Sequence, residues 1–342
     1  MTKILITGGA GFIGSNLAQH FIKRGYQVRI FDNLSRRGAE KNLQWLRNSF
    51  GEAFEFIKGD VRQSEALKTA SVGIDVIYHL AAQVAVTTSV TSPREDFEIN
   101  ALGTFNVLEA ARTSGNNPIV FYSSTNKVYG GMKEIAVRAT SSRYEYLDMP
   151  LGVSESQPLD FYSPYGCSKG AGDQYTRDYS RIYGLRTIVF RQSCIYGERQ
   201  FGVEDQGWLA HFAITAQKGS DVTIYGDGKQ VRDILYISDL VNAIELATIR
   251  HIDITAGKVY NIGGGPSSVL SIWAETRSIL ESLAGHPIET KWGDWRPGDQ
   301  RIYVSDIRSA QKDFGWMPRI APHDGVKKMW DWITENSELF AS

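Results

Sequence analysis

The sequence predicts an α/β protein in which a doubly wound parallel sheet carries a smaller, interleaved C-terminal region. Three observations lead to this prediction. Short apolar runs alternate with helical patterns through the first half of the chain, glycines separate the first run from the first helical pattern, and turn-rich pieces replace the alternation from about residue 194. Strands that alternate with helices are typical of a parallel sheet covered on both faces.

The expected elements follow one another in a regular order. Apolar and β-branched runs predict strands at residues 3–7, 27–31, 55–57, 76–80, 119–123 and 186–191. Apolar residues at helical spacing predict helices from residue 14 to a glycine stop at residue 25, and again over residues 96–112. Residues 131–160 are expected to form one long loop, and loops of that length in compact domains are often functional.

The change of pattern also predicts two regions. Residues 1–193 would form the sheet domain, with residues 234–260 packing back onto it, and residues 194–342 would form the substrate-binding region. Turns such as those at 225–228, 263–266 and 296–299 separate the shorter elements of this second region.

Composition excludes several classes of protein. The 342 residues are 42% hydrophobic and 22% charged, and the net charge of −1 gives no electrostatic footprint for nucleic acid or an anionic membrane. Two cysteines, Cys167 and Cys194, provide no disulfide framework, and the six scattered histidines predict no metal site. The chain shows no leader pattern and no apolar run of membrane-spanning length, so a cytoplasmic location is expected.

A glycine-rich turn joins the first strand to the first helix. Gly8, Gly11 and Gly14 let the backbone turn sharply and approach a pyrophosphate, while the helix N-terminus supplies N–H donors and a favourable dipole. Asp32 ends the second strand, 18 residues beyond Gly14, where a carboxylate accepts from the hydroxyls of an adenosine ribose. The combination predicts a dinucleotide site of the Rossmann type.

Asp32 favours NAD over NADP, because a 2′-phosphate beside it would meet a like charge. Arg36 and Arg37 weigh slightly against this, since an arginine can pair a 2′-phosphate, but solvated loop positions are the favoured interpretation of both. Asp60 and Val61 follow the third strand and are expected beside the adenine, although Asp60 could also be a simple turn residue.

Tyr165 and Lys169 stand four residues apart at the start of a sustained helical pattern. On a helix this spacing puts a phenol and an ammonium on one face. The cation is expected to lower the pKa of the phenol, which makes the pair a candidate general base. Two other Tyr-x-x-x-Lys pairs, at residues 129–133 and 225–229, are broken by glycines and are interpreted as turns.

Together these motifs resemble the extended short-chain dehydrogenase/reductase family of nucleotide-sugar enzymes over nearly the whole chain. The residues that carry the resemblance are Thr7 to Gly14, His79-Leu-Ala-Ala82, Tyr122 to Gly130, Tyr165-Gly-Cys-Ser-Lys169, Gly226 to Asp233 and Arg296-Pro-Gly-Asp299. The resemblance implies that Tyr165 is the acid/base, that Lys169 also holds the nicotinamide ribose, and that Thr125 hydrogen-bonds the reacting hydroxyl.

The resemblance also implies the binding residues. The expected NAD-binding residues are Gly8, Gly11, Phe12, Ile13, Asp32, Asn33, Asp60, Val61, Leu80, Ala81, Ala82, Asn100, Ser123, Tyr165, Lys169 and Gln192. The expected nucleotide-sugar residues are Thr125, Asn126, Gln200, Gln206, Trp208, Arg232 and Arg296. Trp208 could instead belong to the core. For Arg301, a role as a third diphosphate ligand and a surface ion pair are equally favoured. Members of the family are commonly dimers joined through helices, so a homodimer is expected.

Two positions distinguish this chain within the family. Cys194 stands where family members commonly have Asn. Asn126 and Lys127 stand where related 4,6-dehydratases carry Asp and Glu, which remove the C5 proton and help to expel the 6-hydroxyl, so dehydration is disfavoured.

Residues 123–129, 159–170, 199–201 and 205–208 are most similar to enzymes that invert C2 of a CDP-hexose. A UDP-hexose 4-epimerase with the same machinery and a non-catalytic NAD-sensing protein remain the alternatives.

Overall fold

A seven-stranded parallel sheet organises the chain. The computed structural model describes residues 1–296 and 299–340. The strands lie in the order β12 (Lys258–Ile262), β8 (Thr187–Gln192), β5 (Ile119–Thr125), β4 (Val76–His79), β1 (Lys3–Thr7), β2 (Gln27–Asp32) and β3 (Phe54–Lys58). The strand order reverses at β1, which is where ligands of doubly wound sheets bind. The predicted doubly wound sheet is confirmed.

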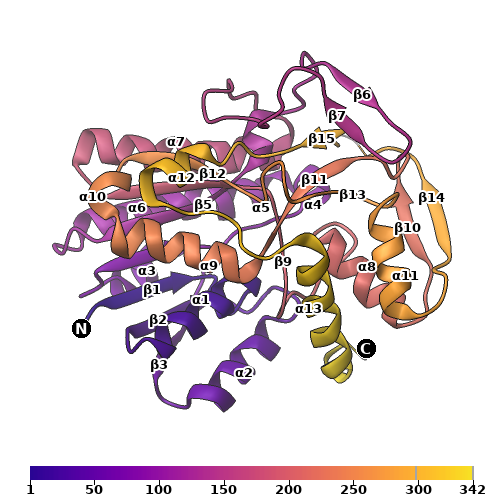
Figure 1. The fold of residues 1–342 in the computed structure, drawn as a ribbon. Helices are drawn as coiled ribbons and strands as arrows, with labels where there is room; N and C mark the ends of the chain where they lie inside the picture. The colour runs from indigo at the N-terminus through magenta and orange to yellow at the C-terminus, as the bar shows by residue number, and fades with distance from the viewer. Residues whose placement is uncertain (297–298, 341–342) are drawn as a thin grey trace.

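Helices cover both faces of this sheet (Figure 1). They are α1 (Phe12–Lys23), α2 (Ala39–Phe50), α3 (Ser64–Ala70), α4 (Val86–Thr91), α5 (Pro93–Phe97), the π turn η1 (Glu98–Leu102), α6 (Gly103–Thr113), the 3-10 turn η2 (Asn126–Tyr129), α7 (Ser163–Tyr183), α9 (Ile237–Glu245), the π turn η3 (Leu246–Arg250), α10 (Ile252–Thr255) and α12 (Arg308–Phe314). The helix expected over residues 96–112 thus spans α5, η1 and α6.

Side chains of each central strand alternate between two apolar cores. Leu5 packs with residues of α3, α6 and α7, whereas Ile4 and Ile6 pack with residues of α1 and α9. This alternation follows from the two-residue period of a strand, and it shows why both faces need a helical layer. Residues 237–262 take part in this domain, because α9 packs against α1 and β12 pairs with β8.

The remaining elements gather at the carboxyl ends of the strands, with α8, β10, α11 and β14 together at the right of Figure 1. They are β6 (Val137–Ala139), β7 (Tyr144–Tyr146), β9 (Cys194–Tyr196), α8 (Trp208–Gln217), β10 (Val222–Tyr225), β11 (Val231–Tyr236), β13 (Val269–Ser271), α11 (Thr276–Ala284), β14 (Thr290–Gly293), β15 (Ile302–Tyr303), α13 (Pro322–Glu335) and η4 (Ser337–Leu339). Among the helices of the described ranges, none is long and apolar enough to cross a membrane.

The segment 131–160 differs from the single long loop that its sequence predicts. Strands β6 and β7 pair in antiparallel register within it, and Val153 forms a bridge with Ser305. Three-residue strands are too short to show a two-residue period, so the residue pattern does not predict this hairpin.

Candidate active site

The glycine-rich turn brings the backbone close to two neighbouring elements. Gly8 has φ of +69°, and a Cβ there would lie 2.7 Å from the backbone nitrogen of Ala81. A Cβ on Gly14 would collide with the carbonyl oxygen of Gly8, so helix α1 begins directly against the turn. Only glycine fits both positions, and the result is an open cradle at the N-terminus of α1.

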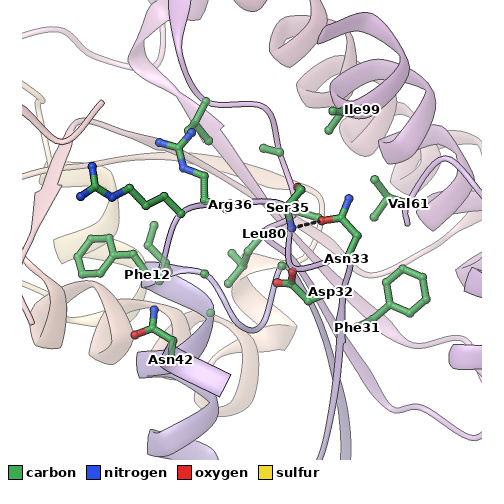
Figure 2. Close-up of a pocket in the computed structure, with 18 of the residues that line it drawn as sticks. Phe12, Phe31, Asp32, Asn33, Ser35, Arg36, Asn42, Val61, Leu80 and Ile99 are labelled. Atoms are coloured by element: carbon green, nitrogen blue, oxygen red, sulfur yellow. Dashed lines mark hydrogen bonds between the residues drawn. The ribbon is translucent and has the colours of Figure 1, made fainter. Parts of the chain in front are cut away.

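A pocket of about 180 Å³ opens over this cradle (Figure 2). Eleven residues that the sequence assigned to the cofactor line it, namely Gly8, Gly11, Phe12, Ile13, Asp32, Asn33, Asp60, Val61, Leu80, Ala81 and Ala82. They come from the ends of β1, β2, β3 and β4, because the carboxyl ends of parallel strands meet at one edge of the sheet.

Two carboxylates on one wall of the pocket are held in fixed orientations. Asp32 accepts the backbone N–H of Ala10 at 3.0 Å and that of Leu34 at 2.7 Å. Asp60 accepts two hydrogen bonds from Arg62, at 2.9 and 2.7 Å, and this contact holds the pKa of Asp60 at about 2. Asp60 is therefore an anchored anion rather than a free turn residue.

Residues far apart in the sequence complete the pocket. Arg36 and Arg37 line it and are exposed, as the solvated-loop interpretation expects, and Arg36 donates to Gln206 Oε1 at 2.7 Å. Arg199 also lines it, with its guanidinium 4.0 Å from the ring centroid of Trp45. Gln200, expected against the sugar, lines this first pocket and also a smaller one that Gln206 and Trp208 share.

The Tyr165–Lys169 pair lies on the first turns of α7. Pro164 stands at the start of this helix and Gly184, with φ of +70°, ends it. The two side chains are buried, with 8% of Tyr165 and 4% of Lys169 exposed. Lys169 Nζ donates to the carbonyl oxygen of Ser123 at 2.5 Å, at the end of β5. The same strand end carries Thr125, so the structure brings together the three residues expected to be catalytic.

In the chain without a bound cofactor, the pKa of Tyr165 is raised, whereas the sequence predicts that it is lowered. Burial raises the pKa of Tyr165 to about 12, against a smaller lowering by its hydrogen bond with Thr125. Burial also lowers the pKa of Lys169 to about 7. Lys169 therefore loses its proton before Tyr165 ionises, and a neutral amine cannot stabilise a phenolate.

A buried ion pair fixes the helix behind this pair. Asp173, one turn after Lys169 on α7, accepts hydrogen bonds from Arg191 of β8 at 2.9 and 3.0 Å and from Ser124 of β5 at 2.8 Å. These contacts join α7 to both strands.

The other residues expected near the cofactor occupy the adjoining strand ends. Asn100 is buried and binds the backbone N–H and carbonyl of Gln83, at 3.0 and 2.9 Å, which fixes the segment after β4. Gln192 pairs in register with Thr125. Its buried Nε2 has no hydrogen-bond partner among the described residues, which suits a position that meets a bound ligand.

A second pocket, of about 240 Å³, opens beside Lys127, two residues after Thr125. Gln206, Trp208, Arg232 and Arg296 line it, as expected for the nucleotide-sugar residues. Four of the residues that sequence reasoning did not assign to the substrate also line it, namely Lys127, Cys194, Asp205 and Asp299.

The remaining side chains of the second pocket have defined partners. Trp208 Nε1 donates to the sulfur of Cys194 at 3.4 Å, so Trp208 forms part of the wall and also packs on the core residue Phe212. Asn126 is buried next to Thr125 rather than in either pocket, and Arg301 stacks on Tyr144. In the described parts of the chain, no cluster of His, Cys, Asp and Glu could hold a metal ion.

Comparisons with known proteins agree with this geometry. Residues 5–329 match the family described as GDP-mannose 4,6 dehydratase. The chain is 44% identical to a CDP-paratose 2-epimerase of Salmonella typhi over 97% of this chain and 99% of that protein. It is 33% identical to a putative UDP-glucose 4-epimerase of Methanocaldococcus jannaschii over 98% of this chain and 99% of that protein.

Solved structures of epimerases share the fold over almost their whole length. The UDP-glucose 4-epimerase of Thermotoga maritima, solved with UDP-glucose, superposes with a TM-score of 0.84 at 29% identity and covers 98% of this chain and 100% of that one. The Thermus thermophilus enzyme, solved with NAD, gives a TM-score of 0.81 at 30% identity, with 98% of this chain and 100% of that one covered. The resemblance to extended short-chain dehydrogenases/reductases is thereby confirmed, and the chain belongs to the GDP-mannose 4,6 dehydratase family.

Proposed function

We propose that this chain is an NAD-dependent epimerase that inverts C2 of a CDP-hexose of the paratose/tyvelose type. The observation that carries the choice of carbon and nucleotide is the full-length 44% identity to a CDP-paratose 2-epimerase. The arrangement of the site supports the chemistry. A dinucleotide pocket lies at the carboxyl ends of the strands, Lys127 next to Thr125 lines a second pocket with two arginines, and Lys169 of α7 contacts the carbonyl of Ser123 in β5.

The residues of the first pocket fit NAD. The glycine cradle offers backbone N–H groups to a pyrophosphate, and Asp32 stands at the strand end where ribose hydroxyls are bound. Gln192 and Lys169 are proposed to face the nicotinamide. Bound NAD would supply a hydride acceptor that returns the hydride, so the reaction involves no net oxidation or reduction.

Tyr165 is the proposed acid/base. As a phenolate it takes the proton of the C2 hydroxyl, and as a phenol it gives a proton back to the same oxygen after the sugar has reoriented. Thr125 orients that oxygen through its hydroxyl group. Lys169 stabilises the phenolate when its amine is protonated, and its contact with the Ser123 carbonyl keeps it beside β5.

The site of oxidation follows from chemistry. A ketone at C4 acidifies the hydrogens on C3 and C5 and leaves C2 untouched, so this machinery inverts C2 only if C2 itself is oxidised. Arg232 and Arg296 are proposed to bind the diphosphate, because the planar guanidinium group suits phosphate oxygens.

Incubation with CDP-glucose and with UDP-glucose, followed by resolution of the product sugars, tests the proposal against its nearest rival. Mannose from CDP-glucose supports a C2 epimerase. Galactose from UDP-glucose, with no mannose from CDP-glucose, would replace the proposal with a 4-epimerase, a function that the Methanocaldococcus relative and the Thermotoga structure favour. A Tyr165→Phe variant that changes no activity in either incubation would favour a non-catalytic NAD-binding protein.

We also propose that the chain forms a homodimer through helix α7 and its neighbours. Tyr175 and Ile182 of α7 are 51% and 66% exposed, and Phe97 and Phe105 on the adjoining helices are exposed as well. An apolar surface of this kind on a soluble protein marks an interaction site. Sedimentation velocity that gave only monomers at micromolar concentration would contradict this part of the proposal.

A further inference from the structure

Lys127 lines the second pocket but has no part in the chemistry described above. Its backbone N–H donates to Thr125 Oγ1 at 3.2 Å, at the start of the 3-10 turn η2. Lys127 therefore belongs to the same turn as Thr125, which is proposed to position the reacting hydroxyl of the sugar. The backbone of this turn sets where Lys127 stands relative to Thr125.

Three cations line this pocket, and two of them already have anionic partners. Arg232 pairs with Asp299 at 2.6 Å, and Arg296 pairs with Glu204 at 2.9 Å. Within the parts of the chain that the structure describes, Lys127 forms no ion pair.

The surroundings of Lys127 leave room for an anionic ligand. Among the residues that the structure describes, its one side-chain hydrogen bond is a long contact of 3.4 Å to Gln300 Oε1. The charged and titratable groups that face it are Arg232, Asp299 and the thiol of Cys194. Burial, followed by the positive charge of Arg232, lowers the pKa of Lys127 to about 8, and an anion placed beside it would raise that pKa again.

The proposed reaction requires a cation at this place. C1 carries the β-phosphate and is bonded directly to C2. When C2 faces the acid/base, the glycosidic phosphate oxygen is therefore attached to the carbon next to the reacting carbon and lies close to the acid/base. Presentation of C4 places C1 on the opposite side of the ring. A C2 enzyme therefore needs a phosphate ligand close to Thr125, whereas a C4 enzyme does not.

We propose that Lys127 binds the β-phosphate of the nucleotide sugar and thereby selects the pose in which C2 faces the acid/base. This inference rests on the proposed function and deepens it by naming a residue that determines which carbon reacts. Lys127 is a substrate-positioning residue, and it takes no proton from the sugar.

Proton uptake on binding gives a test that does not depend on activity. CDP-glucose binding is measured at pH 8 by calorimetry in buffers of different ionisation enthalpy, because the phosphates of this ligand do not titrate near neutrality. With a free pKa of about 8, Lys127 should take up about half a proton for each CDP-glucose bound. CMP, which has no β-phosphate, should cause almost no uptake.

Variants separate charge from structure. Lys127→Gln should lose the uptake, bind CDP-glucose about 10- to 100-fold more weakly and raise KM with a smaller effect on kcat. Lys127→Arg keeps a permanent charge, so it should retain affinity within a few-fold and still take up no proton. Lys133→Gln, which removes an exposed lysine of a neighbouring loop, serves as the matched control and should behave as the wild type.

Three results would overturn the inference. They are unchanged proton uptake in Lys127→Gln, unchanged affinity in that variant, and equal uptake with CMP and CDP-glucose. If CDP-glucose does not bind and UDP-glucose does, the assignment of the nucleotide fails, and the same measurements with UDP-glucose and UMP still decide the role of Lys127.

Discussion

Replacement of Tyr165 by Phe removes one hydroxyl group from a buried site, and its consequences can be worked out from the structure. Burial raises the pKa of Tyr165 to about 12, so at pH 8 only about one molecule in 10⁴ would carry a phenolate. Half-ionisation at pH 8 needs the pKa to fall by about four units, or roughly 5 kcal/mol.

One opposite charge close to a titrating group typically moves its pKa by about 1 to 3 units. A single cation is therefore not enough to lower the pKa of Tyr165 by four units, whereas two cations together can do so. Lys169 can be one of them only while it is protonated, and burial lowers its own pKa to about 7. The second is the positive charge of the bound oxidised cofactor. NAD binding adds one of these charges, so it should lower the pKa of Tyr165 by about 1 to 3 units.

Two assays examine this reasoning. Tyr165→Phe should lower kcat by about 10²- to 10⁴-fold with little change in KM, since it removes the acid/base and leaves the binding groups in place. The alkaline ultraviolet difference between wild type and Tyr165→Phe should report a phenol that titrates near pH 12 without NAD and about 1 to 3 units lower with it. Tyr162→Phe, which changes an exposed tyrosine just before the same helix, is the control for both. Unchanged kcat in Tyr165→Phe, or a pKa that does not respond to NAD, would refute the assignment.

Three further substitutions probe the scaffold and the cofactor pocket. Asp173→Asn leaves the buried guanidinium of Arg191 without its anion and should lower the free energy of unfolding, measured in urea, by about 3 to 5 kcal/mol. Asp178→Asn, on the exposed side of the same helix, should change this free energy little. Equal effects of the two substitutions would contradict the role of the ion pair. Gly8→Ala should abolish co-purification of NAD, because the added Cβ meets the backbone of Ala81. Gly25→Ala, also at positive φ but with open space around it, should retain NAD. Loss of NAD from both variants would show that backbone strain alone is responsible. Asp32→Ser should improve the affinity for NADP relative to NAD, measured by fluorescence titration, because it removes a negative charge from a pocket that Arg36 and Arg37 line. An unchanged ratio of the two affinities would show that Asp32 does not discriminate between the cofactors.

The sheet and the glycine turn could be predicted because their signals are local. The strand at residues 3–7 and the turn at Gly8 lie within a dozen consecutive residues, and their spacing alone specifies a close approach to phosphate. The proximity of the three proposed catalytic residues could also be predicted, since Tyr165 and Lys169 share one helix and the family resemblance assigns Thr125.

Part of the pocket walls could not be predicted, because distant segments make them. Asn42 donates to the carbonyl oxygen of Arg199 across 157 residues of sequence, and Asn42 belongs to no motif. The sequence around Gln200 does not reveal that its segment borders two pockets. For the chain without NAD, the expected lowering of the Tyr165 pKa is wrong, because spacing shows a nearby cation but not the burial of both groups.

The central claim is that hydride leaves C2 and returns to C2 on the other face of the sugar. CDP-glucose that carries deuterium at C2 tests it most directly, with the product epimer analysed by mass spectrometry and NMR after reaction in ordinary water. The account predicts that the product retains deuterium at C2, because the hydride never exchanges with solvent. Replacement of that deuterium by solvent hydrogen would contradict the account, since it would show that C2 is inverted by deprotonation next to a carbonyl at another carbon.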